Sequence, residues 1–467
     1  MTSYGILSVL PATVAILLAF WIKRINAALL AGVVVAIVLL NPQAPWLAPF
    51  RSLDYMVRVA IDPDNFMLIA FSLLVGGLLK LIRDANGFQA FSDAIARARK
   101  GYGKGTVFGL TYVLGTVIFL ECWSNILITG TTLAPLYDKL GISRARLAYF
   151  VHTVGLNMVA MLVINGWGAF YMTLLSAQQI DRPFQLIVSA LPFNLYGWAS
   201  LGMVAFVMAT GLTIGPMREA EAATRAAIEN EGTETASAEP AQPAGPEPRL
   251  SYMLVPILTL IVTMLTSLYL TGNGDITRGA GTASILYASA LATMALAALL
   301  LVKRVFSFGE IEDRIVGGMQ EFFDISLLIV FALSLGELSK DLGTGEYMSR
   351  LVSESLPIFL LPVIIFLLGA LMSFATGTSY GTLAIMVPIV LPMAGATGYD
   401  PALLFGVCLS GAVFGDNTSP VNDNSIITSM ATKVSVIDHV RTQMPYALIA
   451  AGVSAIGFVI VGLLFAR

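Results

Sequence analysis

The chain has 467 residues, of which 57% are hydrophobic and only 12% charged, with a formal net charge of −3. Soluble domains average roughly 25% charged residues, so this composition excludes a water-soluble surface and predicts a polytopic membrane protein whose main partner is the lipid bilayer. The near-neutral charge excludes a nucleic-acid binder. The two cysteines both lie in apolar runs, which excludes a disulfide scaffold.

The chain begins with two apolar segments, 5–21 and 26–41, which predict N-terminal spans within residues 1–64. No basic residue precedes the first segment, and Lys23 and Arg24 follow it. This charge order is typical of a retained span that starts outside the cytoplasm, rather than of a cleaved signal. Further apolar runs that are long enough to span, or nearly so, lie at 65–82, 147–164, 195–214, 252–270, 282–302, 321–338, 400–415 and 444–466.

Two other stretches, 105–136 and 357–394, are too long for one span and contain polar, Gly-rich interruptions. About 20 residues suffice to cross the hydrocarbon, so both stretches predict hairpins or broken helices that enter the membrane and turn back. Basic residues cluster at 23–24, 97–104, 139–146, 216–249 and 303–314. All five clusters can be cytoplasmic at once only if 105–136 returns to the side it entered.

The stretch 216–250 is rich in Ala, Glu and Pro and has no apolar periodicity. This composition predicts a disordered cytoplasmic linker, of which 217–230 could form a surface helix. The linker and the spans in 251–320 would then join two transmembrane units, 65–215 and 321–467.

These two units resemble each other at a nearly constant offset. The pairs Asp84 and Asp341, Ser124 and Ser379, and Leu147 and Leu403 are 257, 255 and 256 positions apart. The charge topology gives 65–82 and 321–338 opposite directions. We therefore predict an all-α polytopic membrane protein with two inverted repeats, each with a re-entrant hairpin and a broken helix, which is the architecture of many secondary transporters.

Polar side chains cluster within the predicted spans at three places. The first cluster, in repeat one, includes Glu121 and Asn125. An ionisable group at membrane depth costs several kcal/mol, which favours a functional role over a structural carboxyl at a hairpin tip. The second cluster, with Thr378, Ser379 and Thr382, falls where the second hairpin should turn, and the alternative there is a Gly/Thr helix-packing seam.

The third cluster follows the apolar run 400–415 and contains Asp416, Thr418, Ser419, Asp423 and Asn424. Two carboxylates among amide and hydroxyl oxygens suit a hard cation, so we predict a cation site at Asp416 and Asp423. An ordinary cytoplasmic loop is the alternative interpretation.

Histidine occurs only twice in the chain. His152 falls within a predicted span and could carry a proton, although a neutral, hydrogen-bonded histidine is an equal alternative. His439 lies in an interfacial stretch and is interpreted as structural. The sequence contains no phosphate-binding loop and no protease or esterase motif, so neither an enzyme nor a cofactor is expected.

At the three clusters the sequence resembles the NhaC family of sodium/proton antiporters, within the ion-transporter superfamily. The matching stretches are "NILITGTTLAPLYDKLGISRARLAYF" (125–150), "FATGTSYGTLAIMVPIVLP" (374–392) and "SGAVFGDNTSPVNDNSIITSMATKVSVIDHVRTQMPYAL" (410–448). The chain departs from the family pattern at Cys122, where the family has a second Asp, and at His152, where an Asp begins Asp-Ser-Thr.

The resemblance implies inverted repeats with re-entrant hairpins, a homodimer, and cation-coupled transport in a bacterial-type inner membrane. It assigns these residues to the transport site: Thr378, Ser379, Gly381, Thr382, Asp416, Ser419, Pro420 and Asp423. The function expected is Na⁺/H⁺ exchange at shared carboxylates, with Asp416, Asp423, Glu121 and His152 as candidates for proton coupling. The alternative is a Na⁺- or H⁺-coupled transporter of a small organic solute, such as an amino acid or a carboxylate.

Overall fold

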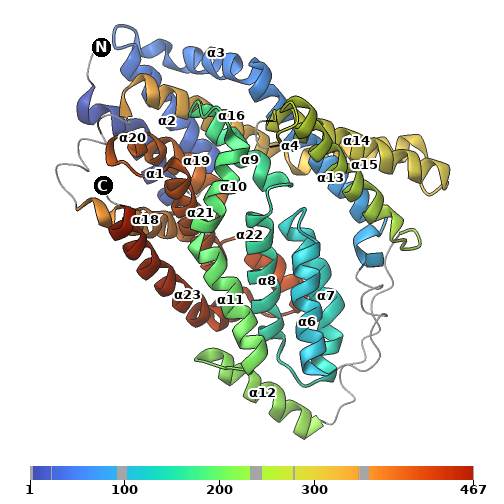
Figure 1. Cartoon of the computed structure of the whole chain (residues 1–467). Coiled ribbons are helices and arrows are strands. Elements are labelled where there is room, and N and C mark those ends of the chain that lie inside the picture. The colour runs from blue at the N-terminus through green and yellow to red at the C-terminus, as the bar shows by residue number, and fades with distance from the viewer. Residues whose placement is uncertain are drawn as a thin grey trace.

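The computed structural model describes residues 4–22, 24–91, 103–231, 245–276, 279–344, 347 and 357–465. Every regular element within these ranges is a helix (Figure 1). The prediction of an all-α protein is therefore confirmed for the described part of the chain.

The helices follow the apolar runs of the sequence. Those of the first half are η1 (Gly5–Val9), α1 (Leu10–Ile22), α2 (Ile25–Leu40), η2 (Pro45–Leu47), α3 (Ala48–Ile61), α4 (Pro63–Asp84), α6 (Lys104–Val117), α7 (Cys122–Lys139), α8 (Arg144–Met161), α9 (Gly166–Ala177), α10 (Pro183–Ala190), η3 (Leu191–Phe193) and α11 (Leu195–Thr210). After them come α12 (Pro216–Glu231), α13 (Ser251–Thr271), α14 (Gly281–Val302), α15 (Phe308–Glu321), α16 (Phe323–Asp341), η6 (Ile358–Leu360), α18 (Leu361–Thr376), α19 (Ser379–Val390), η7 (Leu391–Met393), α20 (Ala394–Thr397), α21 (Pro401–Thr418), α22 (Asp423–Thr432) and α23 (Val436–Phe465).

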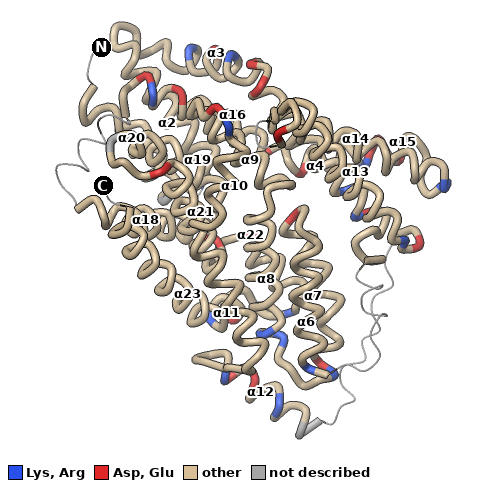
Figure 2. Tube along the Cα trace, in the orientation of Figure 1, with Lys and Arg blue, Asp and Glu red and all other residues tan. Residues whose placement is uncertain are grey.

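Among the described residues, five helices are long and apolar enough to cross a membrane, and up to eight if each of three bent pairs forms one span. The bends are 46° between α8 and α9, 50° between η3 and α11, and 44° between α15 and α16. Apolar side chains on α23 are exposed, including Ile456 at 64% and Leu464 at 73%, as expected of a helix that faces lipid. Charged residues gather toward the outer ends of the molecule (Figure 2).

The stretch 105–136 folds into two helices that run antiparallel. Asn125 Nδ2, near the start of α7, donates to the carbonyl of Gly115, near the end of α6, at 2.7 Å. Further from the break, Thr111 and the Tyr137 hydroxyl lie 2.8 Å apart. Contacts that pair residues outward from a break define a helical hairpin, as predicted for this stretch.

The stretch 357–394 forms a second pair of helices, α18 and α19. Gly377 ends α18 in the left-handed conformation, with φ +71°, which glycine adopts without the strain of a side chain. A methyl group on Gly369 would lie 3.1 Å from Met386 Sδ, so residues on either side of the break face each other. These two helices are therefore also a hairpin.

The hairpins and the broken helices start at a constant offset in the two halves of the chain. The starts of α6 and α18 (Lys104 and Leu361), α7 and α19 (Cys122 and Ser379), α8 and α21 (Arg144 and Pro401), and α9 and α22 (Gly166 and Asp423) are each 257 positions apart. Four equal offsets between helix starts are a sharper sign of an internal duplication than the three approximate ones in the sequence.

The helices that precede the two hairpins, α4 and α16, run antiparallel. Arg83, at the end of α4, pairs with Glu321 just before α16, with Nη2 2.6 Å from a carboxylate oxygen. Ser72, three turns earlier in α4, lies 2.6 Å from Ser326, which is later in the chain than Glu321. Opposite directions of these corresponding helices are what an inverted arrangement of two units requires.

The predicted linker 216–250 is ordered over its first part, because α12 is a helix that packs on α8 and α23. Glu221 of α12 is 5% exposed, forms an ion pair with Arg146 (Nε to Oε1, 3.0 Å) and accepts from Ser143 Oγ at 2.7 Å. The helix that the sequence allowed over 217–230 is therefore present as α12, and the buried ion pair, rather than exposure at the surface, fixes it. Residues 232–244 lie outside the described residues.

We expect Glu221→Gln to release α12 from α8. Removing one charge from a buried ion pair costs about 3–5 kcal/mol, which exceeds what the few remaining contacts of a surface helix supply. Limited trypsin digestion should cut the variant faster after Arg225, which lies within α12. Glu219→Gln is the matched control, because Glu219 is exposed and its pair with Arg441 is worth about 1 kcal/mol or less. Equal digestion rates in the two variants would contradict the expectation.

Candidate functional site

A cavity of about 730 Å³ lies where the breaks of the two hairpins, α6–α7 and α18–α19, meet the breaks of the two broken helices, α8–α9 and α21–α22. These elements contribute Glu121, Cys122, Trp123, Gly166, Trp167, Thr378, Tyr380, Asp416, Asp423 and Asn424 to its lining. The opposite wall comes from α2, α4 and the junction of α15 with α16, and includes Arg24, Leu79, Glu321, Phe322 and Asp324. The cavity therefore joins segments that are up to 400 positions apart in the chain.

Asp416 is the most extensively bonded carboxylate in the lining. Its Oδ2 accepts from the Ser379 backbone N–H at 3.1 Å and from Ser379 Oγ at 2.6 Å, while its Oδ1 accepts from Asn424 Nδ2 at 3.2 Å. The side chain thus joins the end of α21 to the first turns of α19 and α22. Asp416 is only 3% exposed, so its charge is held in a nearly water-free position by polar donors.

Asn424, one of the residues of the cavity lining, has a buried acceptor atom without a protein partner. Its Nδ2 is engaged with Asp416, whereas its Oδ1 is buried without a hydrogen bond. A buried amide oxygen without a donor is costly, and a bound cation would satisfy it. Asp423, the first residue of α22, lies beside it in the same lining.

Among the described residues, no three His, Cys, Asp or Glu side chains form a group that could hold a metal ion. A Na⁺ at Asp416 and Asp423 would therefore complete its coordination with amide, hydroxyl or backbone oxygens. The Asn424 Oδ1 described above has the oxygen chemistry that hard cations require of such a ligand.

Glu121 is the carboxylate at the break of the first hairpin, between α6 and α7. Its two carboxylate oxygens accept from the backbone N–H groups of Trp123 and Ser124, both at 2.6 Å, so that it caps α7. The helix dipole favours a negative charge in this position. As Asp416 accepts from the first residue of α19, each hairpin break already holds a carboxylate of the protein at a helix N-terminus.

Two asparagines connect the hairpins to the broken helices in the same way. Asn165 Nδ2 donates to the carbonyl of Phe119 in the first hairpin break at 3.0 Å, and its Oδ1 caps α9. Asn422 Nδ2 donates to the carbonyl of Gly377 in the second break at 2.8 Å, and its Oδ1 caps α22. The two residues are 257 positions apart, so they occupy equivalent places in the two halves. The sequence analysis did not select either one as a site residue.

The structure separates the sequence-predicted residues into two groups. Glu121, Thr378, Asp416, Asp423 and Asn424 line the cavity, and Ser379 bonds Asp416 directly. The others bond backbone carbonyls near the breaks: Asn125 to Gly115 and Ile118, Thr382 to Thr378, Thr418 to Phe414, and Ser419 to Phe374. The second group thus shapes the breaks rather than facing the cavity.

His152 lies outside the cavity lining and contacts the other histidine of the chain. Its Nδ1 is 2.8 Å from Nε2 of His439, and both residues are fully buried. His439, interpreted from the sequence as a separate structural residue, thus belongs to the same polar group as His152.

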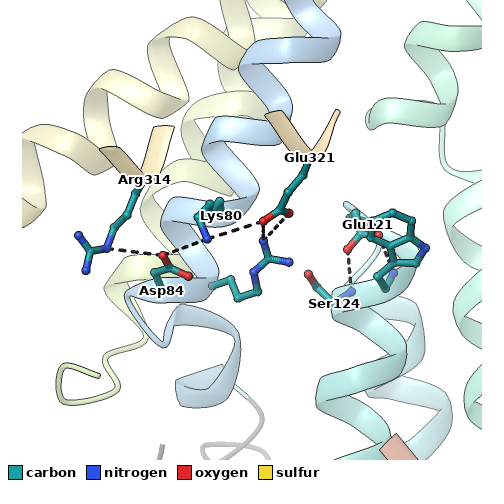
Figure 3. Close-up of polar contacts among 8 residues, drawn as sticks. Lys80, Asp84, Glu121, Ser124, Arg314 and Glu321 are labelled. Atoms are coloured by element: carbon teal, nitrogen blue, oxygen red, sulfur yellow. Dashed lines mark hydrogen bonds and ion pairs between the residues drawn. The ribbon is translucent and has the colours of Figure 1, made fainter. Parts of the chain in front are cut away.

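Acidic residues predominate in the lining. Five carboxylates, those of Glu121, Glu321, Asp324, Asp416 and Asp423, face the cavity together with Arg24. Glu321 is also held by Arg83 and Lys80, and this network continues to Asp84 and Arg314. Figure 3 shows the network with Glu321 on the side nearer to Glu121. An excess of negative charge in a cavity attracts cations.

Aromatic side chains form another part of the wall. The rings of Trp167 and Tyr380 have their centroids 4.7 Å apart, and Trp123 lies in the same lining. Aromatic faces attract cations through the ring quadrupole. The aromatic and the acidic residues therefore favour the same sign of charge in the cavity.

Comparisons with known proteins agree with this picture. Residues 167–463 match the sequence profile of the Na⁺/H⁺ antiporter family, which confirms the resemblance seen in the sequence. An uncharacterised protein of Haemophilus influenzae is 30% identical over 98% of this chain and 91% of its own length. A malate-2H⁺/Na⁺-lactate antiporter of Bacillus subtilis is 31% identical over 36% of each chain. The crystal structure of the Alcanivorax borkumensis YdaH transporter has the same fold, with a TM-score of 0.58, 12% identity, and coverage of 89% of this chain and 88% of that one.

Proposed function

Because this chain belongs to the Na⁺/H⁺ antiporter family, we propose that it exchanges Na⁺ for H⁺ at Asp416 and Asp423. The observation that carries the proposal is the acid-lined cavity, in which the unpartnered Oδ1 of Asn424 lies next to these carboxylates. A secondary transporter of this kind needs no ATP, and its driving force is the gradient of either ion.

The proposed exchange depends on competition between two cations for buried negative charge. An uncompensated carboxylate in a nearly dry site costs several kcal/mol, so the site holds either a proton or Na⁺. Na⁺ binding to the ionised carboxylate displaces the proton, and protonation displaces Na⁺. Ser379 and Asn424, which bond Asp416, keep the carboxylate in place in both states.

Alternating access would follow from the two hairpins and the two broken helices. The 257-residue offset and the antiparallel α4 and α16 support two inverted repeats, although their positions in the bilayer are part of the proposal. Asn165 and Asn422 bond a hairpin break to a broken helix, so each pair would move as one unit. We further propose a homodimer in the bacterial inner membrane with 216–250 on the cytoplasmic side.

Within this proposal Glu121 is a fixed carboxylate of repeat one. Each of its oxygens accepts from a backbone N–H of α7, so Glu121 contributes negative charge to the cavity from a position fixed at this helix N-terminus. Where the family pattern has a second acid, next to Glu121, this chain has Cys122. Cation binding would therefore depend mainly on repeat two.

A second candidate function is the coupled transport of an organic cation. The volume of about 730 Å³ lies within the usual range for small-molecule pockets, roughly 300–1,000 Å³, and the aromatic wall suits an ammonium or guanidinium group. A carboxylate cargo fits less well, because Glu121 and Asp416 already occupy the hairpin breaks where it would bind.

Everted vesicles from bacterial cells without antiporters of their own would test the two functions. The interior is acidified by respiration, and NaCl, LiCl or KCl is added while a ΔpH-sensitive dye is followed. Dequenching by Na⁺ or Li⁺ is expected. With the protein shown to be present, a lack of response to every cation would refute Na⁺/H⁺ exchange. Uptake of radiolabelled basic amino acids, compared with a dicarboxylic acid, would then test the organic-cation function.

A further inference from the structure

The two histidines of the chain meet in a buried polar group away from the cavity. His152 of α8 and His439 of α23 are 287 positions apart, yet Nδ1 of His152 lies 2.8 Å from Nε2 of His439. Neither residue is exposed. A hydrophobic contact between two helices needs no such pair, and a buried imidazole couple is costly unless its hydrogen bonds are satisfied.

The neighbouring Gln443 determines which ring donates. Its Nε2 donates to the backbone carbonyl of Asn417 and lies 3.4 Å from Nδ1 of His152. A carboxamide nitrogen only donates, so Nδ1 of His152 acts as an acceptor. Nε2 of His439 must then carry the proton of the shared hydrogen bond. This tautomer is inferred from the hydrogen-bond network.

The assignment leaves one basic nitrogen free. Nδ1 of His439 is buried without a partner, and in this tautomer it has a lone pair. A proton added there makes His439 an imidazolium ion whose Nε2–H bond to His152 becomes charge-assisted, and therefore stronger. The neutral His152 ring is thus the built-in acceptor for that state.

The pair is connected to the cation site through a single side chain. Gln443 bonds the carbonyl of Asn417, the residue after Asp416 in α21. Asn417 in turn donates from Nδ2 to the Tyr196 hydroxyl at 2.8 Å. The last turn of α21 is therefore held on one side by Ser379 and Asn424, and on the other by the group that contains the histidines.

We propose that the His152–His439 pair is a proton-binding site, with the proton on Nδ1 of His439, whose occupancy opposes Na⁺ binding at Asp416 through Gln443 and Asn417. The proposal rests on the proposed Na⁺/H⁺ exchange. It adds a second proton site, distinct from the carboxylates, to that exchange. Gln443 contacts both the pair and the last turn of α21, so protonation of the pair changes the hydrogen bonds that hold Asp416 in its Na⁺-binding position.

Other charged and titratable groups lie on α8, on α23 and on the helices packed against them. Arg146 of α8 is neutralised by Glu221 of α12. The other groups on α8, α23 and the elements packed against them include the Arg144–Asp138 ion pair, Tyr137, Tyr149, Tyr196, Tyr399, Tyr446, Asp416 and Asp423. Asp438 and Arg441 of α23 are on the exposed face of that helix.

Nuclear magnetic resonance on the full-length protein in nanodiscs would test the pair directly. Because the chain has only two histidines, labelling of histidine alone with ¹⁵N gives two ring systems, provided that purification uses no histidine tag. We expect a coupling across the Nδ1···Nε2 hydrogen bond, and one shared protonation step that moves to lower pH when NaCl replaces choline chloride. Rings that titrate independently, or a protonation step that NaCl does not move, would overturn the proposal.

Two variants separate the pair from its connection to the cation site. His439→Gln keeps a donor for His152 but cannot accept the proton. Gln443→Met keeps the volume but breaks the bond to Asn417, so the shared proton should remain while its response to NaCl is lost. A response to NaCl that persists in Gln443→Met would contradict the proposed route.

Transport kinetics give the corresponding readout. With two competing protons, the KM for Na⁺ at acidic pH should rise about 100-fold per pH unit, against about tenfold in His439→Gln, since each competing proton contributes a factor of ten per unit. Equal slopes would overturn the proposal. If wild-type vesicles show no Na⁺/H⁺ exchange while the ring-to-ring coupling is present, the proposed function fails and the shared proton stands.

Discussion

Asp416→Asn is expected to abolish Na⁺/H⁺ exchange while the protein stays folded. The amide keeps the shape of the carboxylate and can still accept from Ser379, so the contact between α19 and α21 persists. It removes the negative charge that holds either cation. Loss of one partner from a buried charge pair costs about 3–5 kcal/mol, which at 1.4 kcal/mol per tenfold is at least about a 100-fold loss of Na⁺ affinity.

The measurement for Asp416→Asn is the Na⁺-induced dissipation of ΔpH in vesicles, with thermal unfolding in detergent as the test of folding. Asp54→Asn is the matched control, because Asp54 is exposed on α3 and is not part of the cavity lining. It should exchange at the wild-type rate. Near-normal exchange in Asp416→Asn would show that the carboxylate does not carry the exchange.

Gly415→Val is expected to inactivate the protein by separating α21 from α18. A Cβ on Gly415 would lie 2.4 Å from the Ala370 carbonyl oxygen and 2.5 Å from the Phe374 nitrogen. One turn earlier, a Cβ on Gly411 would lie 2.5 Å from the carbonyl oxygen of Phe366. Small residues four apart let two membrane helices approach closely. Because backbone atoms cannot move aside cheaply, overpacking here should cost about 3 kcal/mol or more.

Asp416 follows Gly415 directly, so any displacement of α21 also moves the carboxylate away from Ser379. The expected result for Gly415→Val is therefore both a lower unfolding temperature and a loss of exchange. Gly452→Val is the matched control, since Gly452 also lies within a helix but has open space around it. A Gly415→Val protein with wild-type stability and exchange would contradict the close packing of α18 and α21.

The two helical hairpins could be predicted from the sequence because they depend on local patterns. Apolar runs longer than one span, interrupted by Gly and Thr, have few other ways to satisfy their backbone in a membrane. The offset of 255 between Ser124 and Ser379 differs from the 257 of the helix starts, because that pairing matches residue types rather than helix positions. The structure pairs Cys122 with Ser379, which gives the offset of 257 found at three other helix starts.

The roles of individual polar residues could not be predicted in the same way. Asn165 and Asn422 bond carbonyls 46 and 45 positions earlier in the chain, and no local pattern in a single sequence marks such contacts. His152 and His439, which are in contact, are separated even further in the sequence, by 287 positions. The sequence allowed a surface helix over 217–230 but could not show what fixes α12, because Arg146 lies 75 positions before Glu221.

Proton release on Na⁺ binding tests most directly whether one site serves both ions. Purified protein in weakly buffered detergent, with a pH-sensitive dye, is titrated with NaCl and, as a control for ionic strength, with choline chloride. If Na⁺ and H⁺ share Asp416, NaCl should acidify the solution by at least about one proton for each Na⁺ bound, and Asp416→Asn should release fewer. Saturable Na⁺ binding without proton release in the wild-type protein would contradict exchange at a shared carboxylate.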